Sequence, residues 1–343
     1  MKYPLPLVAG STIAITAPSS GIQPEHEPRI QYVKCYLENL GFQVVEGKCL
    51  RGNHKSASAP ADERADELMA FLLDDDIDAI APPWGGELAM ELLPLLDFEK
   101  LKDVKPKWVM GFSDISTLTA VLTSQLGWAT AHSPNLMDLT ENATERLTAQ
   151  TFQHFSTERG GDFEQVSSLA HTRSWPPISE NPQAVLNPDT PTQWKWLTEP
   201  THSTTMEGRL IGGCWDTLIH LFGTKYLDLQ SMKSQSDEGV LLYLENAEMS
   251  PLDLTRAILS MKFKGVFECI DGLLLGRNAV VDSDADSALI YEDVLNRHLS
   301  LLGIPVMYDL DIGHVPPNLT LINGAVASVS LEDGVGKIIQ KLI

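Results

Sequence analysis

Three residues of this 343-residue chain have side chains suited to acyl transfer, although they lie far apart in the sequence. Ser113 stands in a Gly-Phe-Ser turn, between an apolar run from Trp108 to Met110 and a segment with helical spacing. Such a turn holds a serine oxygen above the end of a sheet, and the next helix places its N–H groups where an oxyanion would form. Glu245 ends a second apolar run, and His314 lies in a loop, after a glycine and before two prolines. A nucleophile, a base and a carboxylate that can orient the base indicate a serine hydrolase.

Ser113 has a second interpretation. Serine is common at the start of a helix, where its hydroxyl caps free N–H groups, and Asp114 in the first turn suits the helix dipole. The turn also lacks the second glycine of the Gly-x-Ser-x-Gly nucleophile motif. The local pattern therefore leaves both a nucleophile and a helix cap open.

Glu245 and His314 also have rivals. A charge at the end of a strand is common, and Glu248 is a competing carboxylate three residues further on. His314 could be a solvated loop histidine. The main rival among the other histidines is His132, which follows a predicted strand and could reach the same edge.

The segment Trp84-Gly85-Gly86-Glu87 is the main candidate for substrate contacts. Paired glycines between a strand and a helix let the backbone approach a ligand and turn N–H groups toward it. Beside a nucleophilic serine, Gly86 would supply one oxyanion-hole N–H and Asp114 the other, with Gly85 and Trp84 contacting the substrate. A plain tight turn is the alternative.

The composition argues against several classes of protein. A formal net charge of −21 disfavours binding to nucleic acid. No apolar run approaches the roughly 20 residues of a membrane span, and the first residues lack the apolar core of a signal peptide. The four cysteines form no C-x-x-C pair and no cluster has metal-ligand spacing, while Asp282, Asp284 and Asp286 lack the glycine and glutamate of a calcium loop. We therefore expect a cytoplasmic protein that uses no metal or cofactor and binds neither a membrane nor nucleic acid.

Residues 1–155 alternate between strand and helix signals, which predicts a domain with a parallel sheet covered on both faces. The predicted strands are Thr12–Thr16, Phe42–Val45, Ile77–Ala81 and Trp108–Met110, and the predicted helices are Arg29–Leu40, Ala61–Leu73, Glu87–Leu96 and Ile115–Leu126. Sites in such sheets form at the carboxyl ends of the strands. Gly85-Gly86 and Ser113 both follow strands, so both are expected at this edge.

Residues 156–204 are rich in Pro, Ser, Thr and Asn, and predict a connection that carries a long functional loop. Residues 205–343 predict a second, β-rich domain. Its predicted strands are Gly208–Ile211, Val240–Leu244, Gly272–Leu275, Val306–Tyr308, Leu319–Ile322 and Val326–Ser330, with helices at Trp215–Phe222, Pro251–Met261 and Tyr291–Leu302.

These segments together resemble the LD-carboxypeptidase family of serine peptidases, which includes the microcin C immunity peptidases. The resemblance covers nearly the whole chain and is carried by several motifs in the family's order: Thr12 to Ser20, Arg64-Ala65, Gly85-Gly86, Leu92 to Asp97, Gly111 to Asp114, Gly208 to Cys214, Leu244-Glu245 and Gly313-His314 with Asn318 following. It implies a Ser113–His314–Glu245 triad at the interface of a Rossmann-like N-terminal domain and a smaller β-rich C-terminal domain. It also implies a homodimer.

Two departures from the family bear on the substrate. The murein-recycling members carry an Arg-Gly-Gly-Tyr-like turn where this chain has Trp84 to Glu87. The Trp194-Lys195-Trp196 segment looks like the aromatic loop of the microcin branch, in which aromatic side chains stack on a nucleobase, although interdomain packing is the alternative. Trp194 and Trp196 are thus candidates for substrate binding.

The resemblance leaves two substrates open: an LD-peptide bond of a murein tetrapeptide, or the amide bond of a peptidyl- or aminoacyl-nucleotide. A different class also stays open, a non-catalytic two-domain protein that closes on a small molecule.

Overall fold

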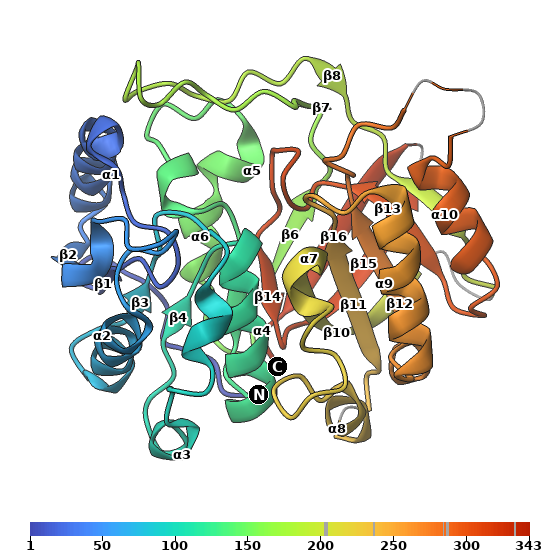
Figure 1. Cartoon of the computed structure of the whole chain (residues 1–343), viewed down its shortest axis with the longest axis horizontal. Helices are drawn as coiled ribbons and strands as arrows, with labels where there is room; N and C mark the ends of the chain where they lie inside the picture. The colour runs from blue at the N-terminus through green and yellow to red at the C-terminus, as the bar shows by residue number, and fades with distance from the viewer. Residues whose placement is uncertain (202–204, 236, 284, 286–287, 333) are drawn as a thin grey trace.

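The computed structural model describes residues 1–201, 205–235, 237–283, 285, 288–332 and 334–343, so Asp284 and Asp286 lie outside the described residues. It has an α/β fold with a parallel sheet in the N-terminal half and a larger mixed sheet in the C-terminal half (Figure 1). This confirms the predicted fold class.

The N-terminal sheet has the strand order β2-β1-β3-β4, and its neighbouring strands are parallel. Ala14 packs with α2 on one face, whereas Ile13 and Ile15 pack with α1 on the other. Because both faces are covered, successive residues of β1, β3 and β4 are buried, whereas the edge strand β2 stays partly exposed. The strands are β1 (Thr12–Ile15), β2 (Gln43–Glu46), β3 (Ala79–Ile80) and β4 (Trp108–Val109), and the helices are α1 (Glu27–Asn39), α2 (Ala61–Leu73), α3 (Phe98–Leu101), α4 (Ser116–Leu126), α5 (Arg146–Ala149) and α6 (Thr151–Phe155).

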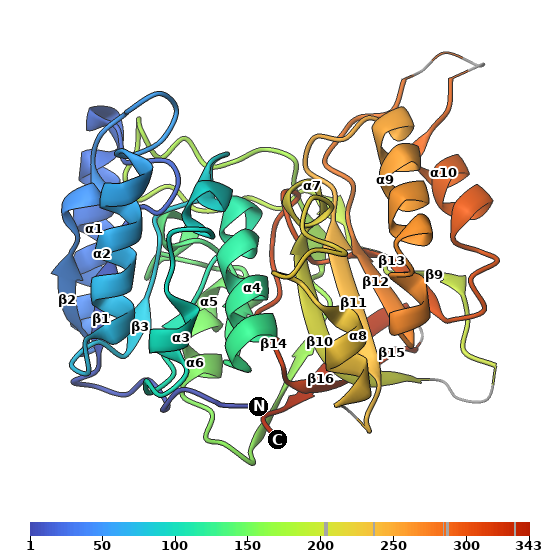
Figure 2. The ribbon, with the colours of Figure 1, turned by 60° about the horizontal axis from the view of Figure 1, so that its bottom comes forward.

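The C-terminal sheet has the order β6-β16-β15-β10-β11-β12-β13-β9. Its four central strands, β10 to β13, are parallel to one another, and antiparallel strands flank them on both sides. Figure 2 shows α9 and α10 on one face of this sheet. The strands are β6 (Asp162–Val166), β9 (Lys195–Thr198), β10 (Thr205–Cys214), β11 (Val240–Glu245), β12 (Gly272–Gly276), β13 (Val306–Leu310), β15 (Val326–Glu332) and β16 (Val335–Lys341), and the helices are α7 (Trp215–Leu218), α8 (Leu229–Ser234), α9 (Pro251–Phe263) and α10 (Tyr291–His298).

Two small sheets and six short 3-10 segments complete the described structure. One small sheet pairs β7 (Ala170–His171) with β8 (Thr190–Pro191), and the other pairs β5 (Thr130–His132) with β14 (Leu321–Asn323). The 3-10 segments are η1 (Pro24–His26), η2 (Lys48–Leu50), η3 (Ala89–Leu92), η4 (Ser113–Ile115), η5 (Leu136–Asp138) and η6 (Phe267–Cys269).

The two halves are joined by direct contacts near the ends of their strands. The β5–β14 pair crosses from one half to the other. In addition, the hydroxyl of Ser116 in α4 accepts a hydrogen bond from the N–H of Cys214 at 2.9 Å. A Cβ at Gly213 would overlap Ser116, so glycine permits this close approach. The carboxyl ends of β4 and β10 are thereby held together.

The segment 156–204 differs from the predicted connection. It supplies β6 and β9, which form the two edge strands of the C-terminal sheet. The strand β16 was not predicted, although Gly336, Ile338 and Gln340 alternate in burial as a half-covered strand does. Its glycine and lysines weaken the local strand signal.

The predicted helix Glu87–Leu96 is wrong, because the structure has only the short turn η3 there. Side chains from other segments form hydrogen bonds with the backbone groups that would pair with each other in a helix. The N–H of Ala89 donates to Asp114, the N–H of Leu88 donates to Ser19, and the Leu88 carbonyl accepts from Arg64.

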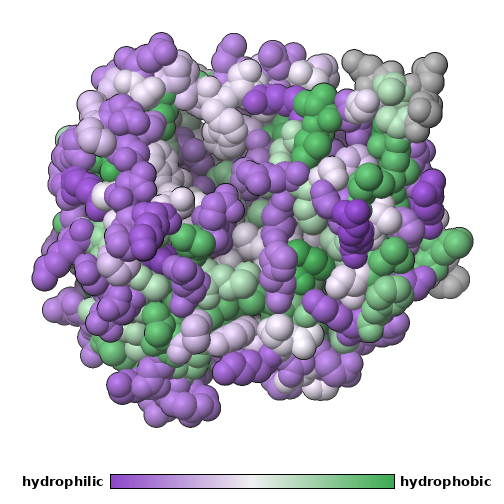
Figure 3. Space-filling view, viewed as in Figure 1, coloured by the Kyte–Doolittle hydropathy of each residue, from purple (hydrophilic) through white to green (hydrophobic). Residues whose placement is uncertain are grey.

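Within the described residues, no helix is both long and apolar enough to cross a membrane. Figure 3 shows a face that is mostly hydrophilic, with apolar side chains in separate small groups.

Candidate active site

Ser113 is the first residue of η4, which forms the sharp turn between β4 and α4. Its φ is +62°, in the left-handed region that residues other than glycine rarely adopt. Asn135 fixes the turn, because its Oδ1 accepts a hydrogen bond from the N–H of Phe112 at 3.0 Å. The cap position of η4 is Phe112 and no side chain caps the segment. A strained serine between a strand and a helix is typical of a nucleophile elbow, so the geometry favours this interpretation over a helix cap.

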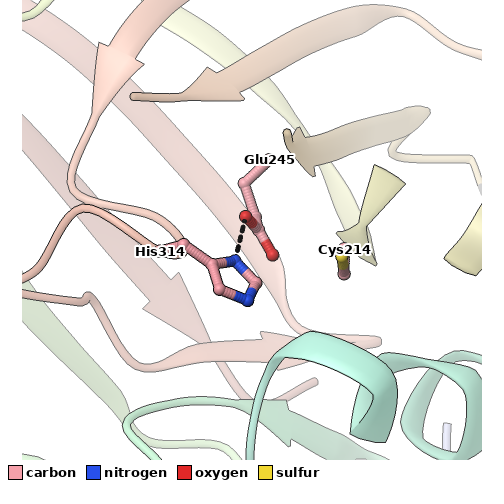
Figure 4. Close-up of side chains that lie close together, drawn as sticks. All are labelled: Cys214, Glu245 and His314. Carbon is pink, nitrogen blue, oxygen red and sulfur yellow. Dashed lines mark hydrogen bonds and ion pairs between the residues drawn. The ribbon is translucent and has the colours of Figure 1, made fainter. Parts of the chain in front are cut away.

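Ser113, His314 and Glu245 lie in one hydrogen-bonded chain. The Nε2 of His314 is 3.0 Å from the Oγ of Ser113, and its Nδ1 is 2.8 Å from the Oε2 of Glu245. Figure 4 shows the carboxylate of Glu245 beside the imidazole ring. Glu245 ends β11, and His314 lies in the loop after β13. The structure thus brings the three predicted residues together from three strand ends and two domains.

Glycine at position 313 makes the pair between His314 and Glu245 possible. Gly313 has φ +98°, and a Cβ there would overlap the Glu245 carboxylate. The backbone N–H of Gly313 donates to Asn318 Oδ1 at 2.6 Å, which fixes the loop. Asn318, noted in the sequence only as following Gly313-His314, therefore helps to hold the imidazole in place.

The rivals to these residues lie outside the hydrogen-bonded chain. His132 is fully buried, and neither of its ring nitrogens has a hydrogen-bond partner in the described part of the protein. Burial, with a smaller contribution from His314, lowers the pKa of His132 to about 3, so this ring stays neutral. Glu248 is exposed, and its backbone N–H, not its side chain, bonds to Asp216.

The environment of His314 suits a general base. Burial by itself would lower the pKa of His314, but the charge and hydrogen bond of Glu245 raise it above its ordinary value. Glu245 is 1% exposed, so little water screens this interaction. An imidazolium that forms during a reaction is stabilised by the same carboxylate.

Gly85 and Asp114 lie directly against the serine. A Cβ at Gly85 would come within 2.8 Å of Ser113 Oγ and 2.9 Å of the Asp114 nitrogen. The next residue, Gly86, has φ +144° and is packed against Ser19 and Ser20. Only glycine at position 85 therefore leaves space between the serine oxygen and the Asp114 N–H.

The side chain of Asp114 connects the serine turn to two other loops. Its Oδ2 accepts from the hydroxyl of Ser19 at 2.6 Å and from the N–H of Ala89 at 2.8 Å. Ser19 follows β1 and Ala89 follows the paired glycines, so the carboxylate joins three loops at the carboxyl edge of the sheet. This role of the side chain was not recognised from the sequence, which indicated the Asp114 N–H as an oxyanion-hole donor and its carboxylate only as suited to the helix dipole.

Several acidic side chains lie close to Glu87, the residue after the paired glycines. Burial, and then the nearby carboxylates of Glu248, Asp114 and Asp216, raise the pKa of Glu87. These residues come from both domains. The local charge disfavours an anionic substrate group beside Glu87.

Trp84 and Trp196 are half-buried, and Trp194 lies in the core. The indole N–H of Trp84 donates to the Ser20 carbonyl at 2.9 Å. Trp194 is 2% exposed, and its indole N–H donates to Asp311 Oδ2 at 2.8 Å. This burial favours packing over substrate stacking for Trp194.

Trp175 is the aromatic residue that the sequence analysis missed. It is 41% exposed and stacks on Phe112, with 6.2 Å between ring centroids and an interplanar angle of 14°. Phe112 precedes Ser113 and contacts His314 edge to face at 5.0 Å. An open indole face is therefore present next to the serine. Its position in residues 156–204, which were predicted to carry a long functional loop, could have indicated Trp175 as a candidate from the sequence.

The comparisons with known proteins agree with this architecture. Residues 13–133 match the LD-carboxypeptidase N-terminal domain, and residues 207–329 match the LD-carboxypeptidase C-terminal domain. The sequence is 26% identical to a putative carboxypeptidase of Vibrio cholerae over 335 residues, which covers 97% of this chain and 96% of the relative. It is also 26% identical to the microcin C7 self-immunity protein MccF of Escherichia coli, over 96% of this chain and 93% of that protein.

Solved structures show the same fold. MccF in complex with glutamyl sulfamoyl guanosine superimposes with a TM-score of 0.83 at 23% identity and covers 99% of both chains. A muramoyltetrapeptide carboxypeptidase from Oxalobacter formigenes has a TM-score of 0.73 at 23% identity and covers 96% of this chain and 99% of its own. The fold and the matched domains define a two-domain peptidase. The chain belongs to the LD-carboxypeptidase family.

Proposed function

We propose that this protein is a serine peptidase or amidase in which Ser113 is the nucleophile, His314 the general base and acid, and Glu245 the residue that orients the imidazole. The observation that carries the proposal is the unbroken chain of hydrogen bonds from Ser113 through His314 to the buried Glu245. The left-handed backbone at Ser113 and the match to both domains of a peptidase family support it.

The proposed reaction proceeds through an acyl-enzyme. Ser113 Oγ attacks the amide carbonyl while its proton moves to His314 Nε2, and Glu245 stabilises the imidazolium. The N–H groups of Gly86 and Asp114 are proposed to hold the oxyanion. His314 then gives the proton to the leaving amine. A water molecule, deprotonated by the same imidazole, attacks the acyl carbonyl; the acyl–Oγ bond breaks, the acid leaves, and His314 returns the proton to Ser113 Oγ.

Two observations favour an aminoacyl-nucleotide as the substrate. MccF, a relative over nearly the full length, has been solved with glutamyl sulfamoyl guanosine and with aspartyl sulfamoyl adenosine. Trp175 presents an exposed indole next to Phe112, and a nucleobase can stack on such a face. A murein tetrapeptide is the second candidate, because a probable murein peptide carboxypeptidase of Bacillus subtilis is 25% identical over 96% of this chain.

Trp175→Ala is expected to raise the KM for an aminoacyl adenosine amide by about tenfold, because base stacking is worth about 1–3 kcal/mol. The KM for a murein tetrapeptide should change little. Steady-state kinetics with both substrates measure this, with Phe263→Ala as the control, because Phe263 is an exposed aromatic residue at the end of α9 and is not a candidate for substrate binding. An equal loss with both substrates would argue against nucleobase stacking at Trp175.

The activity is expected to fall on acidification through a pKa above the ordinary histidine value of about 6.5. His314 must be neutral to accept the serine proton, and Glu245 raises the pKa of His314. In Glu245→Gln the acid limb of kcat/KM should move to lower pH, and kcat should fall by about a hundredfold or more because the tautomer is no longer fixed. A pH–rate profile of both proteins gives the result, and an unmoved acid limb would contradict this role for Glu245.

The test of the proposed function is incubation with two substrates, read by mass spectrometry. One is a murein tetrapeptide that ends in D-Ala, and the other is an aminoacyl adenylate analogue with an amide link. Release of D-Ala indicates cell-wall recycling, and release of the amino acid indicates an immunity-type peptidase. Turnover of neither would favour the alternative class, a non-catalytic protein whose two domains close on a small molecule.

We also propose that the protein acts in the cytoplasm as a homodimer. The four cysteines are all free, as is usual in a reducing compartment. Sedimentation equilibrium measures the oligomeric state.

A further inference from the structure

A thiol lies beside the Glu245–His314 pair and takes no part in the proposed reaction. Cys214 is the last residue of β10 and lies opposite Glu245 in the parallel β10–β11 register. Its Sγ, a carboxylate oxygen of Glu245 and a ring nitrogen of His314 all lie within 4.8 Å of one another (Figure 4). The part of the chain that the structure describes holds no other group of three such ligand atoms this close.

One oxygen of this group has no partner. Glu245 Oε2 bonds to His314, but Oε1 is buried and makes no hydrogen bond to any described residue. Figure 4 shows the second carboxylate oxygen on the side of Glu245 on which Cys214 lies. A buried acceptor without a partner is destabilising, so this oxygen is available for a cation. Asp216 Oδ2, 3.7 Å from the Cys214 sulfur, adds negative charge.

The three ligand types match one class of metal. Thiolate, imidazole and carboxylate together suit Zn²⁺, whose bonds to these atoms are about 2.0–2.3 Å long. Ligands of a tetrahedral zinc stand roughly 3.5 Å apart, so side-chain movements of about 1 Å would close the group around an ion. Mg²⁺ and Ca²⁺ prefer oxygen ligands and are disfavoured here. The His314 side chain is 25% exposed, which gives the ion an entry path.

We propose that Zn²⁺ binds to Cys214 Sγ, Glu245 Oε1 and His314 Nδ1, and that the bound ion reversibly inhibits the enzyme. Cys214 loses its thiol proton to solvent as the sulfur–zinc bond forms. The proton on Nδ1 of the neutral imidazole is replaced by the metal, and the ring carries its proton on Nε2 instead. His314 Nε2 can then no longer accept the proton of Ser113. The inhibition rests on the proposed function, whereas the binding of zinc does not.

Binding is tested without substrate, with Co²⁺ as a spectroscopic substitute for Zn²⁺ in the full-length chain. We expect a near-ultraviolet thiolate-to-cobalt charge-transfer band that one equivalent of Zn²⁺ removes. Ser113→Ala should keep the band and Cys214→Ser should lose it. Cys269→Ser is the matched control, because Cys269 is also a buried thiol and is not one of the three ligands. A band that survives in Cys214→Ser, or no band in the wild type, would overturn the site.

Inhibition is tested by measuring hydrolysis over a range of free Zn²⁺, with Mg²⁺ as the comparison ion. Zinc should inhibit the wild type, and a chelator should restore the rate. In Cys214→Ser, measured against its own zinc-free rate, the inhibition constant should rise by at least about tenfold. A wild-type rate that does not change while zinc displaces the cobalt band would overturn the inhibitory role. A chain that shows the band but hydrolyses neither substrate would refute the proposed function and leave the zinc site standing.

Discussion

Replacing Ser113 with alanine is expected to abolish amide hydrolysis, with a loss in kcat of at least about a thousandfold. The Oγ that attacks the carbonyl is removed, while His314, Glu245 and the surrounding glycines stay in place. The left-handed φ of +62° is retained in the variant, because Asn135 still holds the turn. Mass spectrometry of the products measures the loss, and the thermal midpoint should stay close to that of the wild type.

The matched control for this variant is Ser260→Ala, which removes a hydroxyl in α9. It should hydrolyse substrate at the wild-type rate. A Ser113→Ala protein that is folded and still turns over substrate would refute the proposed nucleophile. Covalent labelling of the wild type by a fluorophosphonate, lost in Ser113→Ala, would locate the nucleophile independently.

Gly85→Ala is expected to lower kcat/KM by about a hundredfold or more, comparable to the loss of an oxyanion-hole donor. The added methyl group would lie 2.8 Å from Ser113 Oγ and 2.9 Å from the Asp114 nitrogen, within the space that a tetrahedral intermediate needs. Serine and the Asp114 backbone belong to a turn fixed by Asn135 and Ser19, so they cannot move away freely. Steady-state kinetics together with thermal unfolding separate a loss of activity from a loss of fold.

The control for Gly85→Ala is Gly303→Ala. Gly303 has φ +75°, and a Cβ there would meet nothing within 4 Å. This variant should lose about 1 kcal/mol of stability through backbone strain but keep its kcat/KM. If Gly85→Ala retained full activity, the space beside Ser113 would not be the site of the oxyanion.

The arrangement of strands explains why the site lies where it does. Ser113 follows β4 of the N-terminal parallel sheet. Glu245 ends β11 and His314 follows β13, and both strands belong to the parallel part of the C-terminal sheet. Both sets of carboxyl ends meet because β5 pairs with β14 across the two halves and because Ser116 bonds to Cys214. A site of this kind depends on the interface, so changes at Ser116 are expected to affect the geometry of the triad.

The sequence by itself determined the local features. Alternating strand and helix signals predicted the parallel N-terminal sheet, and the helix Ala61–Leu73 was predicted at its observed bounds. Gly-Phe-Ser between a strand and a helix indicated Ser113 because the turn depends on a few neighbouring residues. Glu245 and His314 were candidates from their local settings, and the order of the motifs in the family resemblance placed them in the triad with Ser113.

Only the tertiary structure decided questions that depend on residues far apart. His132 and His314 are both plausible bases from local sequence, but 201 positions separate His314 from the serine that it contacts. The sequence indicated Trp194 as a substrate-binding candidate and not Trp175, yet Trp194 fills the core and Trp175 is 41% exposed beside Phe112. Segment 89–92 is a short turn because the side chains of Asp114, Ser19 and Arg64 form hydrogen bonds with the backbone groups of Leu88 and Ala89. Local periodicity indicates which face of a helix or strand is buried. It does not indicate which other segment covers that face, because that segment lies elsewhere in the chain.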